Sequence, residues 1–297
     1  MTAKRNRWLV GGVLIVALAA FLSLSLLPLL GSIGNQQGSS PNPSPTGSAA
    51  DRQAQLEQEV KGYEAVLKRE PDNVTALQGL VEARIQLGQL EEVIEPLEKL
   101  AQLNPEQPEY TILLGQAKQQ LGDLDGAAQS YRDVLDERPG NMQAMQGLVA
   151  LLVQQDRPQA AIGLLQDTLQ TAEQLAAEGT NTIDTTSVRL LLAEVQVASG
   201  NVEQALTIYD NAITEAGGDF RPLLAKALVL KGEGRSDEAQ PLFDQAQALA
   251  PDQYKDQIQQ MAAETPPETA PTGNEGAEVS PEVAPSETDE SGTETEE

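Results

Sequence analysis

The chain has 297 residues, of which 45 are acidic and 19 basic, and its formal net charge is −26. A protein this acidic lacks the basic face that nucleic acids require, and the same charge disfavours electrostatic docking on anionic lipid. Because the sequence contains no cysteine and no histidine, it excludes disulfides, thiolate or imidazole metal sites, and catalytic triads of the usual type.

The first residues, 1–7, are basic and are followed by an uncharged apolar segment, Trp8 to Leu30. A helix of this length would cross a hydrocarbon core of about 30 Å. The basic flank predicts a cytoplasmic N-terminus, with the rest of the chain on the opposite side of the membrane. A cleaved signal peptide is the alternative, but the apolar run is long for one and no clear small-residue cleavage pattern follows it. We therefore expect an uncleaved single-pass anchor over 8–30.

A linker rich in glycine, serine and proline covers residues 31–50 and is expected to be flexible. The next segment, Asp51 to Glu70, has helical spacing of its apolar residues, and Asp51 is a plausible N-cap. Tyr63 and Val66 occupy positions that recur in the second helix of each repeat described next. This segment is therefore predicted to be a half repeat that starts an array.

A repeat is visible in the spacing of two kinds of residue. Proline occurs at Pro71, Pro105 and Pro139, and glycine at Gly88 and Gly122, always with the same step between one and the next. Each proline would end the second helix of a hairpin, and each glycine would give the turn between the two helices a positive backbone dihedral. The sequence thus predicts stacked hairpins of two helices, here called helix A and helix B.

Small and large residues also recur in this frame. We expect close helix crossings at three pairs that share one spacing, Gly115 with Ala127, Ala193 with Ala205, and Ala227 with Ala239. Larger apolar residues are expected to fill the layers between hairpins: Leu80, Leu114, Leu148 and Leu192 from helix A, and Leu97, Tyr131, Leu165, Tyr209 and Phe243 from helix B.

This pattern resembles the tetratricopeptide repeat family, whose repeat of about 34 residues contains two helices and has the same period as the step seen here. The match covers residues 74–105, 108–139, 142–172, 186–217 and 220–251. It departs from the family pattern in that no tryptophan opens a helix A and the third repeat lacks its terminal proline. The resemblance implies an all-α solenoid over 51–263, with about five repeats, the N-terminal half repeat and a C-terminal cap helix over 251–263.

The repeat period is interrupted once, in the third repeat. The third repeat is longer than the period, so its helix B is predicted to continue to Ala176 or Ala177, before a polar loop over 179–182. We favour a simple insertion at the edge of the solenoid over a partner contact.

Residues 264–297 contain 11 acidic residues and no basic one. They are expected to form a disordered tail, either solubilising or attractive to a basic partner.

No catalytic residue, metal site, cofactor or small-molecule substrate is predicted, and the chain is not expected to be an enzyme. The concave face, formed by the A helices, is the candidate surface for a protein or peptide partner. Its first half is rich in amides and its second half is apolar, and it lacks the Lys, Arg and Asn clamp with which some family members hold a partner's carboxylates. The candidate residues are Gln78, Glu82, Gln86, Ile112, Gln116, Gln119, Gln146, Val153, Leu190, Glu194, Val197, Leu224 and Leu228.

The order of segments resembles that of membrane-anchored tetratricopeptide proteins of cyanobacteria and plastids. This resemblance implies a scaffold that binds partners beside a membrane, in the assembly or maturation of membrane complexes, with its repeats in the periplasm or the thylakoid lumen. The alternative is an exported, soluble periplasmic protein that acts as a binding protein or chaperone after cleavage of the N-terminal segment.

Overall fold

The computed structural model describes residues 49–263, and every regular element in this range is helical. The predicted anchor, most of the linker and the acidic tail lie outside the described residues. Within that range, no helix combines the length and the apolar character needed to cross a membrane. The elements are α3 (Ala49–Leu67), α4 (Val74–Gln86), the short 3-10 helix η1 (Glu91–Val93), α5 (Ile94–Leu103), α6 (Pro108–Gln120), α7 (Leu124–Glu137), α8 (Met142–Gln154), α9 (Pro158–Ala177), α10 (Thr185–Ala198), α11 (Val202–Ala216), α12 (Phe220–Gly232), α13 (Ser236–Leu249) and α14 (Asp252–Ala263).

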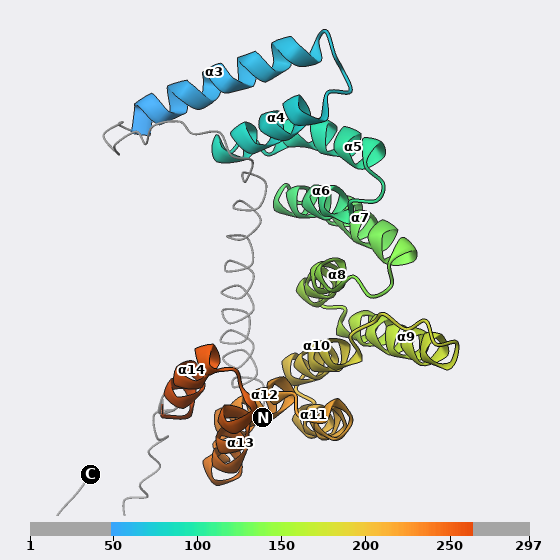
Figure 1. Cartoon of the computed structure of the whole chain (residues 1–297), viewed down its shortest axis with the longest axis vertical. Coiled ribbons are helices and arrows are strands. Elements are labelled where there is room, and N and C mark those ends of the chain that lie inside the picture. The colour runs from blue at the N-terminus through green and yellow to red at the C-terminus, as the bar shows by residue number, and fades with distance from the viewer. Residues whose placement is uncertain (1–48, 264–297) are drawn as a thin grey trace, which may run out of the picture.

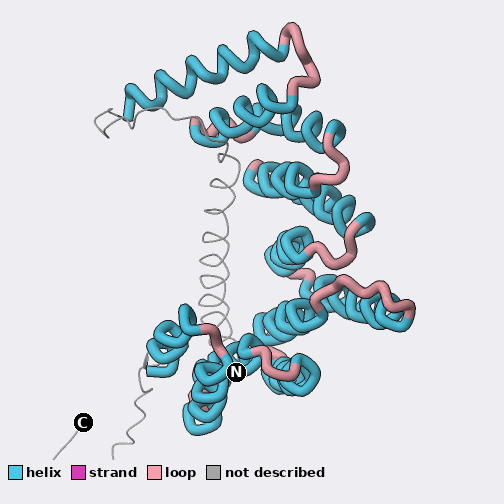
Figure 2. The backbone as a smooth tube through the Cα atoms, in the orientation of Figure 1, coloured by secondary structure: helices cyan, strands magenta, loops and turns pink. Residues whose placement is uncertain are grey.

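The helices form hairpins that stack into a curved solenoid (Figure 1). Helices α4, α6, α8 and α10 line the inner side of the curve, and α5, α7, α9 and α11 lie on the outer side. Figure 2 shows the short connections between them. Among the described residues, α3 precedes the first complete hairpin and α14 follows the last one. Asp51 lies in the first turn of α3 and is not its N-cap.

The turns inside the hairpins confirm the role predicted for glycine. Gly88 and Gly122 have φ values of 72° and 83°, in the region that favours glycine because it lacks a Cβ atom. In the third repeat the equivalent position is Asp156, whose φ is 57°. It is the one residue other than glycine in the described part of the chain with a positive φ.

The residues predicted to fill the core do so. The small residues Ala127, Ala193, Ala205 and Ala227 have no exposed surface, and the large residues of the repeat frame are all buried. One predicted contact differs. The atoms nearest to the space beside Gly115 belong to the ring of Tyr131, so this ring, and not Ala127, fills that space.

The insertion in the third repeat is folded onto the solenoid. Helix α9 continues to Ala177, as predicted, and the loop of residues 178–184 follows. Ile183 in this loop is buried and packs against Gly140 in the turn between α7 and α8. Asp184 then caps α10, because its Oδ1 accepts a hydrogen bond from the backbone N–H of Ser187 at 3.1 Å. The inserted residues therefore join the second, third and fourth repeats.

Candidate peptide-binding face

Each inner helix keeps one narrow strip of its surface open to solvent. In α10, for example, Ser187, Leu190 and Glu194 are partly exposed, while Val188 and Leu192 beside them are buried. The exposed residues follow helical spacing, so they share one side of the helix. Helix α10 packs against α8, α9, α11 and α12, and these four neighbours leave only that side free. The corresponding strips of α4, α6, α8, α10 and α12 are called the inner strips below.

Most of the candidate residues lie on these strips, but two do not. Ile112 and Val197 are only 1% and 7% exposed and belong to the core, so their side chains are not part of the exposed strips. The other candidates are exposed or half-buried: Gln78, Glu82, Gln86, Gln116, Gln119, Gln146, Val153, Leu190, Glu194, Leu224 and Leu228.

Several polar residues of the strips bind one another across neighbouring inner helices. The amide of Gln78 in α4 donates to the hydroxyl of Tyr110 in α6. Gln119 in α6 donates to Oε1 of Gln154 in α8, with 3.2 Å between nitrogen and oxygen. Part of the hydrogen-bonding capacity of these amides is therefore used between repeats, and this part is not available to a partner.

Polar contacts also link neighbouring inner helices in the apolar half of the face. Arg221 at the start of α12 donates to the hydroxyl of Ser187 in α10 at 2.8 Å, and it also forms ion pairs with Asp184 and Asp219. Burial acts to raise the pKa of Asp184, but hydrogen bonds from Ser187 and the charge of Arg221 outweigh it, so this pKa lies below its ordinary value. Arg221 is therefore already occupied by carboxylates of this chain.

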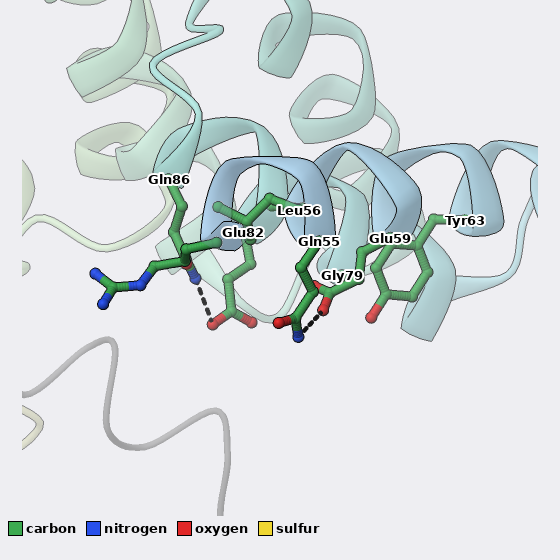
Figure 3. A pocket seen from close by; sticks show the side chains of 9 residues that line it. Gln55, Leu56, Glu59, Tyr63, Gly79, Glu82 and Gln86 are labelled. Carbon is green, nitrogen blue, oxygen red and sulfur yellow. Dashed lines mark hydrogen bonds between the residues drawn. The ribbon is translucent and has the colours of Figure 1, made fainter. Parts of the chain in front are cut away.

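A cavity of about 220 Å³ lies at the N-terminal end of the face, between α3 and α4 (Figure 3). Glu82 accepts a hydrogen bond from Gln86, and across the cavity Glu59 accepts one from Gln55 at 3.0 Å. The ring of Tyr63 lies against Gly79 and forms one wall. The cavity thus combines the guanidinium of Arg52 with two carboxylates, two amides and an aromatic ring, and it includes two of the candidate residues.

Sequence reasoning did not place Glu59 at this site. It occurs on α3 where the following hairpins have a buried apolar residue, such as Val93 or Ala127. The carboxylate of Glu59 is only partly buried and accepts the hydrogen bond from Gln55. The signal was present in the repeat frame, since counting back one period from Val93 leads to Glu59.

The electrostatic environment of Glu194 differs from that of the other candidates. Burial raises the pKa of this carboxyl to about 7. Tyr209 in α11 is also affected, because burial and then the charge of Glu194 raise the pKa of its hydroxyl. Burial likewise raises the pKa of Tyr131 to about 12. Glu194 makes no hydrogen bond or ion pair with any residue in the described range.

Residues 49–263 contain no cluster of three or more acidic side chains that could hold a metal ion. The inner strips offer amides, a few carboxylates and apolar side chains. Such a surface can hold a peptide by side-chain hydrogen bonds and by burial of apolar groups.

Comparison with known proteins agrees with this architecture. Residues 50–251 match the model of a family described as tetratricopeptide repeat. The chain is 32% identical over 166 residues to cellulose synthase operon protein C of Xanthomonas axonopodis pv. citri (strain 306), a match that covers 56% of this chain. It is 24% identical over 199 residues, 66% of the chain, to the protein SLOW GREEN 1, chloroplastic, of Arabidopsis thaliana. The matches span 11% and 61% of those two proteins' lengths.

Two solved structures to which this chain is similar are a tetratricopeptide repeat protein from Parabacteroides merdae and yeast Tom70. The first is 16% identical, with a TM-score of 0.41 over 71% of this chain and 78% of that one. The second is 13% identical, with a TM-score of 0.49 over 77% of this chain and 44% of that one. Because the family model covers most of the sequence and every hairpin of the solenoid, this chain belongs to the tetratricopeptide repeat family.

Proposed function

We propose that this protein is a membrane-tethered scaffold that binds a protein or peptide partner along its inner strips, in the assembly or maturation of membrane complexes. The family to which it belongs consists typically of protein-interaction scaffolds and not of enzymes. The observation that carries the proposal is the set of partly exposed strips on α4, α6, α8, α10 and α12. Helices α4, α6, α8 and α10 line the inner side of the curve (Figure 1). A curved row of this kind is the usual recognition surface of a helical solenoid.

The tether is proposed from the sequence. Residues 8–30 are uncharged, apolar and preceded by basic residues, which is the pattern of a membrane anchor. A linker of glycine, serine and proline over 31–50 would hold the solenoid near the membrane while leaving it free to turn. The relative from Arabidopsis thaliana carries the word chloroplastic in its name, which is compatible with a photosynthetic membrane as the setting.

The test is a pull-down from detergent-solubilised membranes of the source cells, with the full-length chain as bait. A variant with Leu190→Glu and Leu224→Glu places two charges on the apolar half of the inner strips. The matched control, Gln166→Glu with Gln204→Glu, places two charges at exposed positions of the outer helices α9 and α11. We expect partners that are lost with the first variant and kept with the second.

Mapping of the bait's N-terminus in the same experiment tests the tether. A membrane-bound bait that retains residues 1–30 supports the anchor, whereas a soluble bait that begins near residue 32 would support the exported form. If both double variants capture the same proteins as the unchanged chain, the inner strips do not bind the partner and the proposal fails.

A further inference from the structure

One carboxylate on the inner strips has no partner and lies among leucines. Glu194 is half-buried on α10, one helical turn after Leu190. In the repeat frame the same two positions on α12 are Leu224 and Leu228, and Leu228 is 40% exposed. The hydrogen bond between Arg221 and Ser187, which are one repeat period apart, shows that the strips of α10 and α12 lie side by side. The four residues Leu190, Glu194, Leu224 and Leu228 are called the inner patch.

The cations of α12 are all engaged away from Glu194. Lys226 binds the carboxylate of Asp210, Arg221 is held by Asp184 and Asp219, and Lys231 donates to backbone carbonyls near the end of α14. No other basic residue occurs in α12.

The remaining helices packed against α10 supply no cation either. Helix α8 has no charged residue, and the charged residues of α9 are the exposed carboxylates Asp167 and Glu173. Helix α11 carries Glu203, Asp210 and Glu215, which bind Arg235, Lys226 and Arg189 respectively. Tyr209 of α11 is the titratable group that the charge of Glu194 affects. The carboxylate of Glu194 therefore has no counter-ion within the described structure.

A charge that loses water without gaining a partner costs free energy. Burial raises the pKa of Glu194 to about 7, the direction expected for a carboxylate that has lost water without gaining a partner. An incoming ammonium or guanidinium group would supply the missing charge, and the partly apolar surroundings would strengthen the attraction relative to water. Leu190 on the same helix and Leu224 and Leu228 on α12 would at the same time accept apolar side chains.

We propose that the inner patch binds a peptide segment that presents one lysine or arginine flanked by apolar side chains. This inference rests on the proposed function, because it assigns a partner chemistry to the same inner strips. The polarity is opposite to that of a clamp for a partner's carboxylates, which would need free cations at these positions.

The test is a selection of random dodecapeptides displayed on phage against the full-length protein in detergent. We expect the selected peptides to share a single lysine or arginine between apolar residues. In Glu194→Gln, which keeps the shape of the side chain, their affinity should fall by roughly tenfold or more. The matched control is Glu173→Gln, which changes an exposed and unpartnered carboxylate on α9, and it should leave the affinity unchanged.

Two further outcomes separate this inference from the proposed function. Some selected peptides could lose binding to Leu224→Glu but bind Glu194→Gln as tightly as the unchanged protein. That result would show that Glu194 does not recognise a lysine or arginine, while the inner strips would still be the binding surface. Selected peptides whose binding no inner-strip substitution alters would overturn both. A thermal melt of each variant shows whether it is folded, and Glu194→Gln should melt at or above the temperature of the unchanged chain, because it removes an uncompensated charge.

Discussion

The ring of Tyr131 in α7 lies directly against Gly147 in α8, with no room between them for a methyl group. A Cβ atom built on Gly147 would lie 2.6 Å from Cζ of Tyr131, and one built on Gly115 would lie 2.9 Å from Cε1 of the same ring. Tyr131 is thus held between the helix A of its own hairpin and that of the next. The contact with the following helix A recurs between α3 and α4, where the ring of Tyr63 lies against Gly79.

Gly147→Ala should destabilise the solenoid, because the new methyl group would overlap the Tyr131 ring. A displaced ring in a packed core costs about 1–3 kcal/mol of the free energy of unfolding. Thermal and urea-induced unfolding, followed by circular dichroism, measure this loss.

The control for this substitution is Gly163→Ala in α9, where a Cβ atom would meet no other atom within 4 Å. There the change should be neutral or stabilise by up to about 1 kcal/mol, because alanine favours a helix over glycine. Tyr131→Leu introduces the residue found at the equivalent positions Leu97 and Leu165, and it should remove most of the cost of Gly147→Ala. Equal effects of Ala at 147 and 163 would mean that the ring does not constrain α8.

The recurrence of proline and glycine predicted the hairpins, because these residues act through their own backbone wherever they occur. The turn of the third repeat was not predicted in the same way, since it contains neither residue at the expected place. Asp156 follows Gly122 by one repeat period and adopts the positive φ of the glycine turn all the same. Aspartate enters this region more readily than most residues, because its short side chain can bond locally.

Asp156→Gly should therefore stabilise the protein by about 0.5–1 kcal/mol, because glycine adopts a φ of this sign without strain. The reverse experiment is Gly122→Ala, which places a Cβ atom at a φ of 83° and should destabilise by about 1 kcal/mol or more. Both are read from the midpoint of thermal unfolding. A lower midpoint for Asp156→Gly would mean that the stabilisation by the aspartate side chain exceeds the free-energy cost of its positive φ.

The inner strips were predicted less well than the hairpins. An inner helix is covered on most of its circumference, so a step of one residue, or about 100°, moves a side chain from solvent to core. Ile112 is buried, while the next residue, Leu113, is only partly so. The spacing of the frame fixes which helix lines the curve, but the width of the open strip depends on how neighbouring hairpins pack, which the sequence of one repeat does not specify. Glu194 lacks a counter-ion because the cations of other helices form ion pairs elsewhere, and the sequence around Glu194 gives no indication of this.

Ile183→Ala should show that the insertion is an integral part of the fold. Ile183 is 6% exposed and packs on Gly140, so its truncation leaves a cavity between the loop and the solenoid and should cost about 2–4 kcal/mol. Thr182→Ala changes the exposed neighbouring residue and should have little effect. If the two variants unfold at the same denaturant concentration, the loop does not anchor the third repeat to the fourth.

Glu194 should also make the stability of the protein depend on pH. The pKa of this carboxyl is raised from 4.5 to about 7 in the folded chain, so between these pH values the folded state binds more protons than the unfolded state. Stability must then fall as pH rises through this window. The contribution of Glu194 is fully present below about pH 4.5 and is lost above about pH 7, with a total of about 1–3 kcal/mol after allowance for its partial exposure.

Carboxylates with lowered pKa, such as Asp184, act in the opposite direction at lower pH, so the unchanged chain and Glu194→Gln must be compared at each pH. The difference between their free energies of unfolding should grow in favour of the variant as pH rises from about 5 to 8. Glu173→Gln, on the exposed side of α9, is the control for the loss of a carboxylate. If the difference between Glu194→Gln and the unchanged chain does not vary with pH, water or a counter-ion already stabilises the ionised carboxylate in the folded chain. The inner patch would then have no unmatched charge with which to recognise a basic residue.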